Sequence, residues 1–232
     1  MKLTAELAVL TQYDTPTICN ALELIVPQRR ATGFTIEHMV CRDPAMPPMV
    51  GYARTATIRA VTPAQGEAAA LREHRFNYYR YIAQGGPTPS IVIIQDLDPV
   101  PGFGAFWGEV NTAIHKGLHC QGVVTNGSIR DLPQCAPGFQ LLAGKVGPSH
   151  AHVHIVDYGK PVNVFGMAVN DGDVIHADGH GAVVIPAEAI DRIPAAVDLL
   201  VRREAVILDC ARGDGFDIEK LRQAMSTSAD IH

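Results

Sequence analysis

An arginine and an aspartate stand next to each other where one apolar run of the chain ends. The run GVVTNGSIRD closes on Arg130 and Asp131. A guanidinium presents a planar fork of N–H donors that matches a carboxylate, and an aspartate offers the hard oxygen ligands that Mg²⁺ and Mn²⁺ prefer. The pair therefore predicts a site for a small anionic keto acid, its carboxylate on Arg130 and its keto oxygen on a divalent cation.

A second stretch, FWGEVNTAIHKG, places Gly108 at a turn from loop to helix. A helix start offers free backbone N–H groups and the positive end of the helix dipole, which favour a carboxylate or a phosphate. A parallel sheet would bring this turn and the turn at Arg130 to the same carboxyl edge, where open α/β sheets bind ligands. The sequence thus predicts that both turns contribute to one site.

The same residues also permit a purely structural interpretation. The spacing of Ser128 and Asp131 matches a helix-capping pattern, in which Asp131 would only close the first turn of a helix. Arg130 would then be a surface residue. The spacing taken alone favours this simpler interpretation.

The elements that would position these residues alternate between helices and strands in the middle of the chain. The predicted helices cover residues 4–11, 15–25, 63–86, 105–117, 186–213 (with a break near Pro194) and 216–225. The predicted strands cover residues 51–62, 90–98, 120–127, 138–147 and 150–159, and residues 162–186 are rich in strands and turn glycines. Residues 27–50 indicate a loop with a short strand. This order predicts an α/β protein with a partly parallel sheet and a β-rich half, folded as one compact domain over residues 1–232.

Composition excludes several classes of protein. The chain has 232 residues, 47% of them hydrophobic and 19% charged, which is enough to build a sizeable core. The net charge of −5 and the lack of a basic block argue against a nucleic-acid partner. The sequence contains no run of eighteen apolar residues, so no membrane span is predicted. The chain start lacks a signal-peptide pattern, and the five widely spaced cysteines are typical of reduced thiols, so a cytoplasmic protein is expected.

Four motifs, in this order, resemble the RraA-like family, which includes 4-hydroxy-4-methyl-2-oxoglutarate and 4-carboxy-4-hydroxy-2-oxoadipate aldolases. They are PTICNALE near the start, GEVN at 108–111, NGSIRD at 126–131 and VNDGDVIHADGHGAVVIP at 169–186. The resemblance covers most of residues 15–222. It implies an α/β fold, a single compact domain with a layered α/β/β/α architecture, similar to swivelling phosphohistidine-type domains.

The activity that the resemblance implies is a pyruvate aldolase that depends on Mg²⁺ or Mn²⁺ and also decarboxylates oxaloacetate. Both reactions pass through a metal-stabilised pyruvate enolate. By resemblance, Arg130 binds the pyruvyl carboxylate and Asp131 holds the metal, partly through waters. Backbone groups of four residues would line the substrate pocket: Gly108, Glu109, Val110 and Asn111. Glu109 is also a candidate catalytic carboxylate, through the metal waters or as a first-turn acid that complements the helix dipole.

The resemblance also implies partners. Family members form trimers, often paired into hexamers, with sites at subunit borders. Residues 196–232 are predicted to form a helical extension that contacts a neighbouring subunit. Within it, Glu204 is the candidate for a catalytic glutamate supplied across that border, although an exposed helix charge is the simpler interpretation. Another family branch implies the alternative function, a non-catalytic regulator that binds an RNA-degrading endonuclease by protein contact.

Two residues depart from the family pattern. Asn126 and Asn20 stand where many members have aspartate. If either aspartate tunes a metal-bound water, the reaction of this chain is weakened or altered. An extra segment at residues 64–86, rich in arginine and tyrosine, could shape specificity or an interface.

Histidines offer a rival chemistry. His150, His152 and His154 are predicted to lie on one face of a strand, at a spacing that can bind zinc. No acidic or cysteine partner is evident near them, so a packing or interface role is favoured. The segment IHADGHG, which contains His176, is interpreted as two strands joined by turn residues.

A Schiff base would be the other aldolase mechanism. None of the five lysines lies inside a buried apolar strand run, and Lys145 comes nearest to doing so. The lysines therefore do not favour this mechanism.

Overall fold

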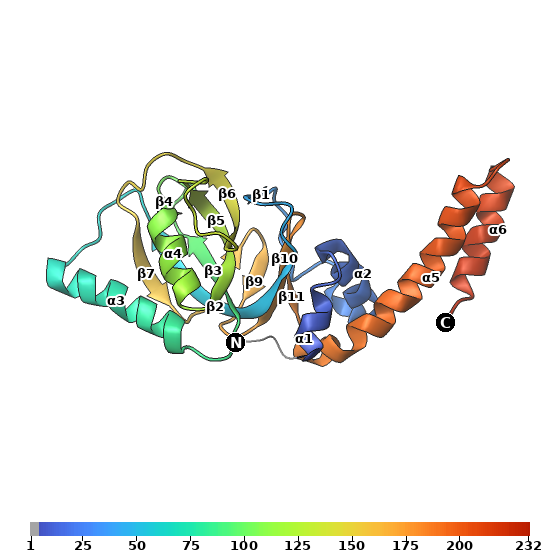
Figure 1. The fold of residues 1–232 in the computed structure, drawn as a ribbon, viewed down its shortest axis with the longest axis horizontal. Helices are drawn as coiled ribbons and strands as arrows, with labels where there is room; N and C mark the ends of the chain where they lie inside the picture. The colour runs from blue at the N-terminus through green and yellow to red at the C-terminus, as the bar shows by residue number, and fades with distance from the viewer. Residues whose placement is uncertain (1–4) are drawn as a thin grey trace.

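The computed structural model describes residues 5–232, and its centre is a curled sheet of nine strands (Figure 1). The strands of this sheet are β1 (Val40–Cys41), β2 (Met49–Arg59), β3 (Ser90–Asp96), β4 (Ala105–Trp107), β5 (Cys120–Ile129), β6 (Gln140–Val146), β7 (His154–Tyr158), β10 (Val174–Asp178) and β11 (Gly181–Ile185). A separate hairpin is formed by β8 (Val162–Val164) and β9 (Met167–Val169).

The strand order places a parallel block at the centre of the sheet. The order is β1-β6-β5-β3-β2-β10-β11, with β4 paired to β5 and β7 paired to β2. Strands β2, β3, β5 and β6 run parallel to their neighbours within this block, whereas β1, β7, β10 and β11 pair antiparallel. The prediction of a partly parallel sheet is therefore confirmed. Because parallel strands end at one edge, the segments that follow β3, β5 and β6 lie close together.

The parallel block forms because its strands are apolar on both faces, as covered parallel strands are. In β3 the run from Ile91 to Ile94 is fully buried, and β5 is buried along almost its whole length. These are the continuous apolar runs from which the strands over 90–98 and 120–127 were predicted.

Six α-helices and two short 3-10 helices are described in residues 5–232. They are α1 (Ala5–Leu10), α2 (Thr15–Ile25), η1 (Pro27–Arg29), α3 (Ala68–Gln84), α4 (Glu109–Gly117), η2 (Ala187–Arg192), α5 (Ile193–Arg212) and α6 (Ile218–Ala229). Helix α2 begins where predicted, because the Asp14 carboxylate caps it by accepting a hydrogen bond from the Thr17 N–H at 2.9 Å.

Three apolar clusters separate the layers of the fold. One lies between α3, α4 and the parallel block, around Trp107 and Phe139. A second fills the inside of the curled sheet against the hairpin β8–β9, around Met167. The third lies beneath α1, α2 and the start of α5, around Leu10 and Ile18. The order of layers is therefore α/β/β/α, as predicted for one mixed α/β domain.

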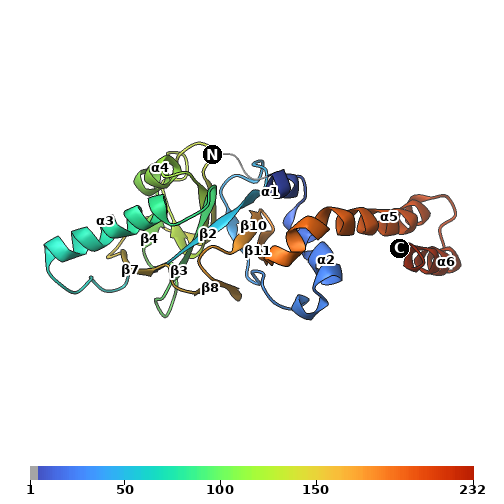
Figure 2. The same ribbon diagram turned by 90° about the horizontal axis from the view of Figure 1, so that it is seen from below.

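The last two helices leave the body of the molecule as an arm. Helix α5 is buried only at its root, at Ile193 and Val197, and α6 folds back along α5 (Figures 1 and 2). The Ser228 hydroxyl donates to the Arg203 carbonyl at 2.9 Å and joins the two helices. This arm corresponds to the predicted helical extension over 196–232, and its contact with a neighbouring subunit stays a prediction.

Two predictions of local structure are wrong. Residues 105–107 form strand β4 and not the start of a helix, because they pair with the end of β5. Strand β7 begins only at His154, so residues 150–153 form a turn. The predicted break near Pro194 is confirmed, because the 3-10 helix η2 ends at Arg192 and α5 begins at Ile193, with Pro194 in its first turn, where proline is tolerated. The first residue of the predicted helix 4–11 lies outside the described residues.

Within residues 5–232, no helix is both long and apolar enough to cross a bilayer.

Candidate functional site

The end of strand β5 and the start of helix α4 lie side by side. Strand β4, which leads into α4, pairs with β5 through Trp107 and Ile129. The Arg130 N–H then donates to the Trp107 carbonyl at 2.9 Å. This pairing brings Arg130 and Asp131 next to Gly108, although 22 positions of the printed sequence separate Gly108 from Arg130.

Gly108 is in contact with the Arg130–Asp131 pair. A Cβ added at Gly108 would lie 2.6 Å from Asp131 Oδ2 and 3.2 Å from Arg130 Cγ. The backbone of Gly108 is extended, with φ −162°, so the close approach and not the conformation requires a glycine here. The helix start and the aspartate carboxylate therefore share one small space.

Asp131 has a left-handed backbone, with φ 53°, which aspartate tolerates better than most residues. Its carbonyl accepts hydrogen bonds from the N–H groups of Gln134 and Cys135, which closes a turn. Ser128 lies in β5, and its buried hydroxyl has no hydrogen-bond partner among the described residues. The capping interpretation is therefore wrong, because Ser128 caps nothing and a turn, not a helix, follows Asp131.

The pair forms an ion pair that is open to ligands. Arg130 Nη1 lies 3.1 Å from Asp131 Oδ2 and 3.2 Å from Oδ1. The two side chains keep 34% and 32% of their surface exposed. A half-exposed guanidinium that is held at one end by a carboxylate still has N–H donors for a second anion.

Arg42 fixes the turn that carries Asp131. Its guanidinium donates to the carbonyls of Leu132, Cys135, Ala136 and Phe139 at 2.9–3.2 Å. One side chain thus satisfies four backbone acceptors of residues 131–139, which otherwise have no regular structure. Sequence reasoning missed Arg42, because it lies in the proline-rich stretch 27–50 and no motif marks it.

The first turn of α4 supplies the other predicted site residues. Glu109 and Val110 are exposed, and Asn111 is half-buried. Burial raises the pKa of Cys135, while a hydrogen bond with Thr112 and the charge of Arg42 act in the opposite direction. The Asn111 amide donates to the Phe106 carbonyl at 2.6 Å and accepts from the Tyr79 hydroxyl at 2.8 Å. One N–H of the Asn111 amide is therefore not used by these contacts, and Asn111 lines the cavity described below.

His115 joins α4 to α3 beneath the site. Its Nδ1 lies 2.6 Å from the Asn111 carbonyl, so Nδ1 carries the proton and Nε2 accepts from the Tyr78 hydroxyl at 2.8 Å. Both His115 and Tyr78 are fully buried. Burial lowers the pKa of His115 to about 4, because the charged ring would lose its hydration.

We expect His115 to make the protein sensitive to acid. Below pH 6.5 the unfolded chain binds a proton at this histidine and the folded chain does not, so the free energy of unfolding falls as the pH drops from about 6.5 to about 4. The gap between these pKa values corresponds to about 3 kcal/mol. Urea unfolding at pH 7, 5.5 and 4.5 measures the effect. His115→Gln should make the free energy of unfolding depend less steeply on pH. His38→Gln, at an exposed histidine, should leave that dependence unchanged. An unchanged pH dependence in His115→Gln would contradict the assignment.

A cavity of about 590 Å³ opens beside Arg130. Its walls come from β4 and α4 on one side, from α3 on another, and from the turn and first residues of β7 on a third. His150, His152 and His154 line it, although the predicted strand face that would gather them is absent. Within residues 5–232 no three histidine, cysteine, aspartate or glutamate side chains are grouped closely enough to hold a metal ion.

The two departures from the family pattern lie outside this cavity. Asn126 is buried in β5, where its amide accepts from the Asp96 N–H at 2.7 Å and donates to the Asp96 carbonyl at 3.1 Å. A carboxylate could accept but not donate, so asparagine suits this pairing between β5 and β3. Asn20 is exposed on α2, which packs mainly against α5, β11 and β10.

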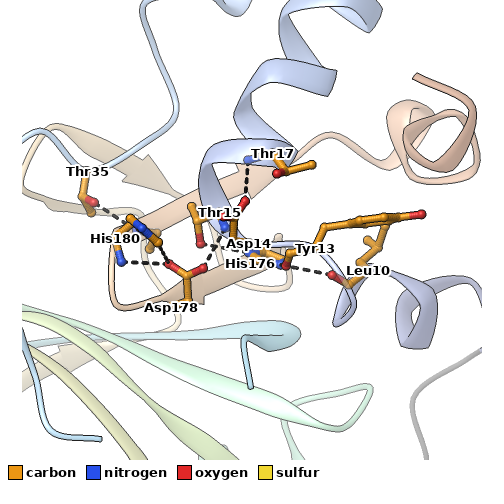
Figure 3. Close-up of polar contacts among 10 residues, drawn as sticks. Leu10, Tyr13, Asp14, Thr15, Thr17, Thr35, His176, Asp178 and His180 are labelled. Carbon is orange, nitrogen blue, oxygen red and sulfur yellow. Dashed lines mark hydrogen bonds and ion pairs between the residues drawn. The ribbon is translucent and has the colours of Figure 1, made fainter. Parts of the chain in front are cut away.

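His176, Asp178 and His180 of the segment IHADGHG form a cluster of hydrogen bonds with the start of α2 (Figure 3). Asp178 accepts hydrogen bonds at 2.8 Å from the N–H groups of Thr15 and His180, and buried His176 contacts the Thr15 hydroxyl at 3.0 Å. Strands β10 and β11 form the predicted hairpin, and this cluster ties it to the start of α2. Burial lowers the pKa of His176, which keeps the ring neutral in this packing.

Two further candidates lie away from the Arg130–Asp131 pair. Glu204 is exposed on α5, in the arm at the opposite end of the molecule from α4 (Figure 1), so it joins no site within one chain. Its role across a subunit border stays a prediction. Lys145 is exposed near the end of β6, where it covers Gly102, and it is not part of the cavity wall.

Fold and site together define a class: a layered α/β domain with an arginine–aspartate pair and a helix start at the carboxyl edge of its parallel strands. The chain belongs to the RraA-like family, described as Aldolase/RraA, whose family model matches residues 15–184. The resemblance seen in the four motifs is thereby confirmed.

Individual relatives are distant. Protein DlpA of Legionella pneumophila is 23% identical over 145 residues, which are 59% of this chain and 22% of DlpA, so the chain spans only about a fifth of that relative. An uncharacterized protein from Pseudomonas syringae has a TM-score of 0.70 at 20% identity, covering 98% of this chain and 96% of its own. RraAS2 of Streptomyces coelicolor, described as an unusual member of the RNase ES inhibitor RraA protein family, has a TM-score of 0.68 at 20% identity, covering 88% and 96%. These likenesses establish the fold.

Proposed function

We propose that the chain is a divalent-metal-dependent lyase that cleaves a C–C bond of a pyruvyl keto acid, and that the same site decarboxylates oxaloacetate. The observation that carries this proposal is the close approach of Gly108 to Asp131. A Cβ placed on Gly108 would lie 2.6 Å from Asp131 Oδ2. This close approach supports a single site in which a guanidinium, a carboxylate and the free N–H groups of a helix start face one another. Family membership is compatible with this activity.

The residues present fit a hydrated Mg²⁺ or Mn²⁺ ion. Mg²⁺ keeps several waters and needs only one or two protein carboxylates. Asp131 supplies one carboxylate that is 32% exposed, and Glu109 supplies a second at the same helix start. When bound there, the ion would act as a Lewis acid toward the keto group of the substrate.

Arg130 and α4 would bind and orient the substrate. The guanidinium of Arg130 takes the pyruvyl carboxylate, and the unpaired N–H groups of the first turn of α4 add donors beside it. In the cleavage step the C4 hydroxyl loses its proton, the C3–C4 bond breaks, and C3 of the resulting pyruvate enolate is protonated. We assign the transfer of that proton to Glu109, the carboxylate in the first turn of α4.

Metal dependence tests the proposal. We expect pyruvate release from oxaloacetate and from 4-hydroxy-4-methyl-2-oxoglutarate in the presence of Mg²⁺, followed by a loss of at least about 100-fold in EDTA. Added Mg²⁺ should restore the rate. A lactate dehydrogenase assay measures the pyruvate. Turnover that is indifferent to EDTA would remove Asp131 from its proposed role, and no turnover of any pyruvyl acid would refute the lyase.

A second candidate is a regulator without catalytic activity. It is favoured by the likeness in fold to RraAS2 and by the apolar side chains that the arm exposes, which include Val201, Phe216 and Ile218. A regulator would bind a ribonuclease and release no pyruvate, so the same assay separates the two functions.

The arm is also the basis for the proposed assembly as a trimer or hexamer. Exposed apolar residues on a helix pair that touches the body only at its root are suited to contact a second subunit. Light scattering on the purified protein decides between one, three and six copies.

A further inference from the structure

The cavity beside Arg130 is larger than a pyruvyl group requires. Its volume of about 590 Å³ falls within the range of about 300–1,000 Å³ that is usual for drug-sized ligands. Arg130 occupies only one part of its wall, and α3 forms another part through Leu71, Arg72 and Arg75. A three-carbon keto acid held on Arg130 would leave the α3 side of the cavity unfilled.

The cavity is strongly cationic. Its wall contains three arginines and four histidines and neither aspartate nor glutamate, although the whole chain has a net charge of −5. Such a concentration of one sign in a hollow with low-dielectric walls focuses the electrostatic potential on ligands of the opposite sign. The cavity is therefore suited to a ligand with more than one negative charge.

Arg72 and Arg75 are not engaged within the protein. They lie three residues apart on α3 and so share one face of the helix. In the described part of the chain, neither makes an ion pair or a hydrogen bond. Arg80, on the same helix, differs because it pairs with Glu73 at 4.0 Å, bonds to Asn77 and lies over the ring of Phe76.

We propose that Arg72 and Arg75 form a second anion subsite, which binds a distal carboxylate or phosphate of the substrate while Arg130 binds the pyruvyl carboxylate. This inference rests on the proposed function. It assigns recognition of the distal group to α3, which lies in the extra segment at residues 64–86. The turn from His150 to Ile155, on another wall of the cavity, supplies three histidine side chains and no repelling carboxylate.

Binding of an unreactive pair of probes tests the subsite. Pyruvate and 2-oxoadipate share the pyruvyl group, but only 2-oxoadipate carries a distal carboxylate, and it lacks the C4 hydroxyl needed for cleavage. We expect the wild-type protein with Mg²⁺ to bind 2-oxoadipate at least tenfold more tightly than pyruvate in calorimetric titrations. In the double variant R72A/R75A this ratio of affinities should fall to near one. Circular dichroism checks that α3 is retained.

Matched controls separate the outcomes. R80A changes an arginine of the same helix outside the cavity and should keep the wild-type ratio, whereas R130A should weaken both probes. A ratio that is the same in wild type and R72A/R75A would overturn the subsite, as would a wild-type protein with no preference for 2-oxoadipate. If inorganic phosphate at submillimolar concentration competes with 2-oxoadipate, the distal group is a phosphate. If it does not compete, the distal group is a carboxylate. Because no turnover is required, a protein that binds as expected but releases no pyruvate would refute the lyase and leave the subsite standing.

Discussion

Replacement of Arg130 by alanine is expected to lower kcat/KM for pyruvate release about 100- to 1,000-fold. The variant loses the guanidinium that binds the substrate carboxylate, and it also leaves Asp131 without the partner that lies 3.1 Å away. Removing one partner of a hydrogen-bonded charge pair costs about 2–5 kcal/mol, a range that includes the about 2.7–4.1 kcal/mol to which this loss of rate corresponds. Steady-state kinetics with oxaloacetate and saturating Mg²⁺ measures the change.

Two further variants make this result specific. Arg130→Lys keeps the charge but not the planar fork, so it should recover only part of the activity. Arg80→Ala removes an exposed arginine of α3 that lies outside the cavity wall and should have no effect. An R130A variant with wild-type kcat/KM would contradict the assignment of the carboxylate site.

Gly108→Ala is expected to reduce kcat/KM about 100-fold while the protein stays folded. The new Cβ would lie 2.6 Å from Asp131 Oδ2, too close for van der Waals contact, so the carboxylate must move. A displacement of about 1 Å in a positioned group can cost about 100-fold in rate. Kinetics together with a thermal melt measures both effects.

Gly117→Ala is the matched control in the same helix. A Cβ at Gly117 meets nothing within 4 Å, so the variant should keep its activity and be no less stable. If Gly108→Ala and Gly117→Ala had equal activity, the close approach of Gly108 to Asp131 would have no functional meaning.

The parallel block could be predicted from the sequence because its signals are local. Continuous apolar runs such as Ile91–Ile94 read directly as buried strands, and their parallel pairing places the following turns at one edge. The adjacency of Gly108 and Arg130 follows from that topology. The local sequence could not decide whether Asp131 caps a helix or belongs to a binding site, because the answer depends on whether a helix or a turn follows Asp131.

Other parts of the site depend on contacts that leave no local signal. Residues 105–107 have helical spacing but form β4, because pairing with β5 outweighs the intrinsic preference. The α3 wall of the cavity is set by Tyr78 and Tyr79, which reach His115 and Asn111 on another helix. The alternation of HAHVH suggested a strand, but Ala151 has a left-handed backbone, with φ 47°, which belongs to a turn.

Asp131 owes its place to a residue from a distant part of the chain. The carbonyls that Arg42 satisfies lie between 90 and 97 positions further along the sequence. Another protein with a segment like NGSIRD but without an arginine docked in this way would leave those carbonyls to solvent, and its aspartate would sample several backbone states. In this chain the short signature is therefore enough to find the site, but the backbone position of Asp131 depends on an arginine outside that signature.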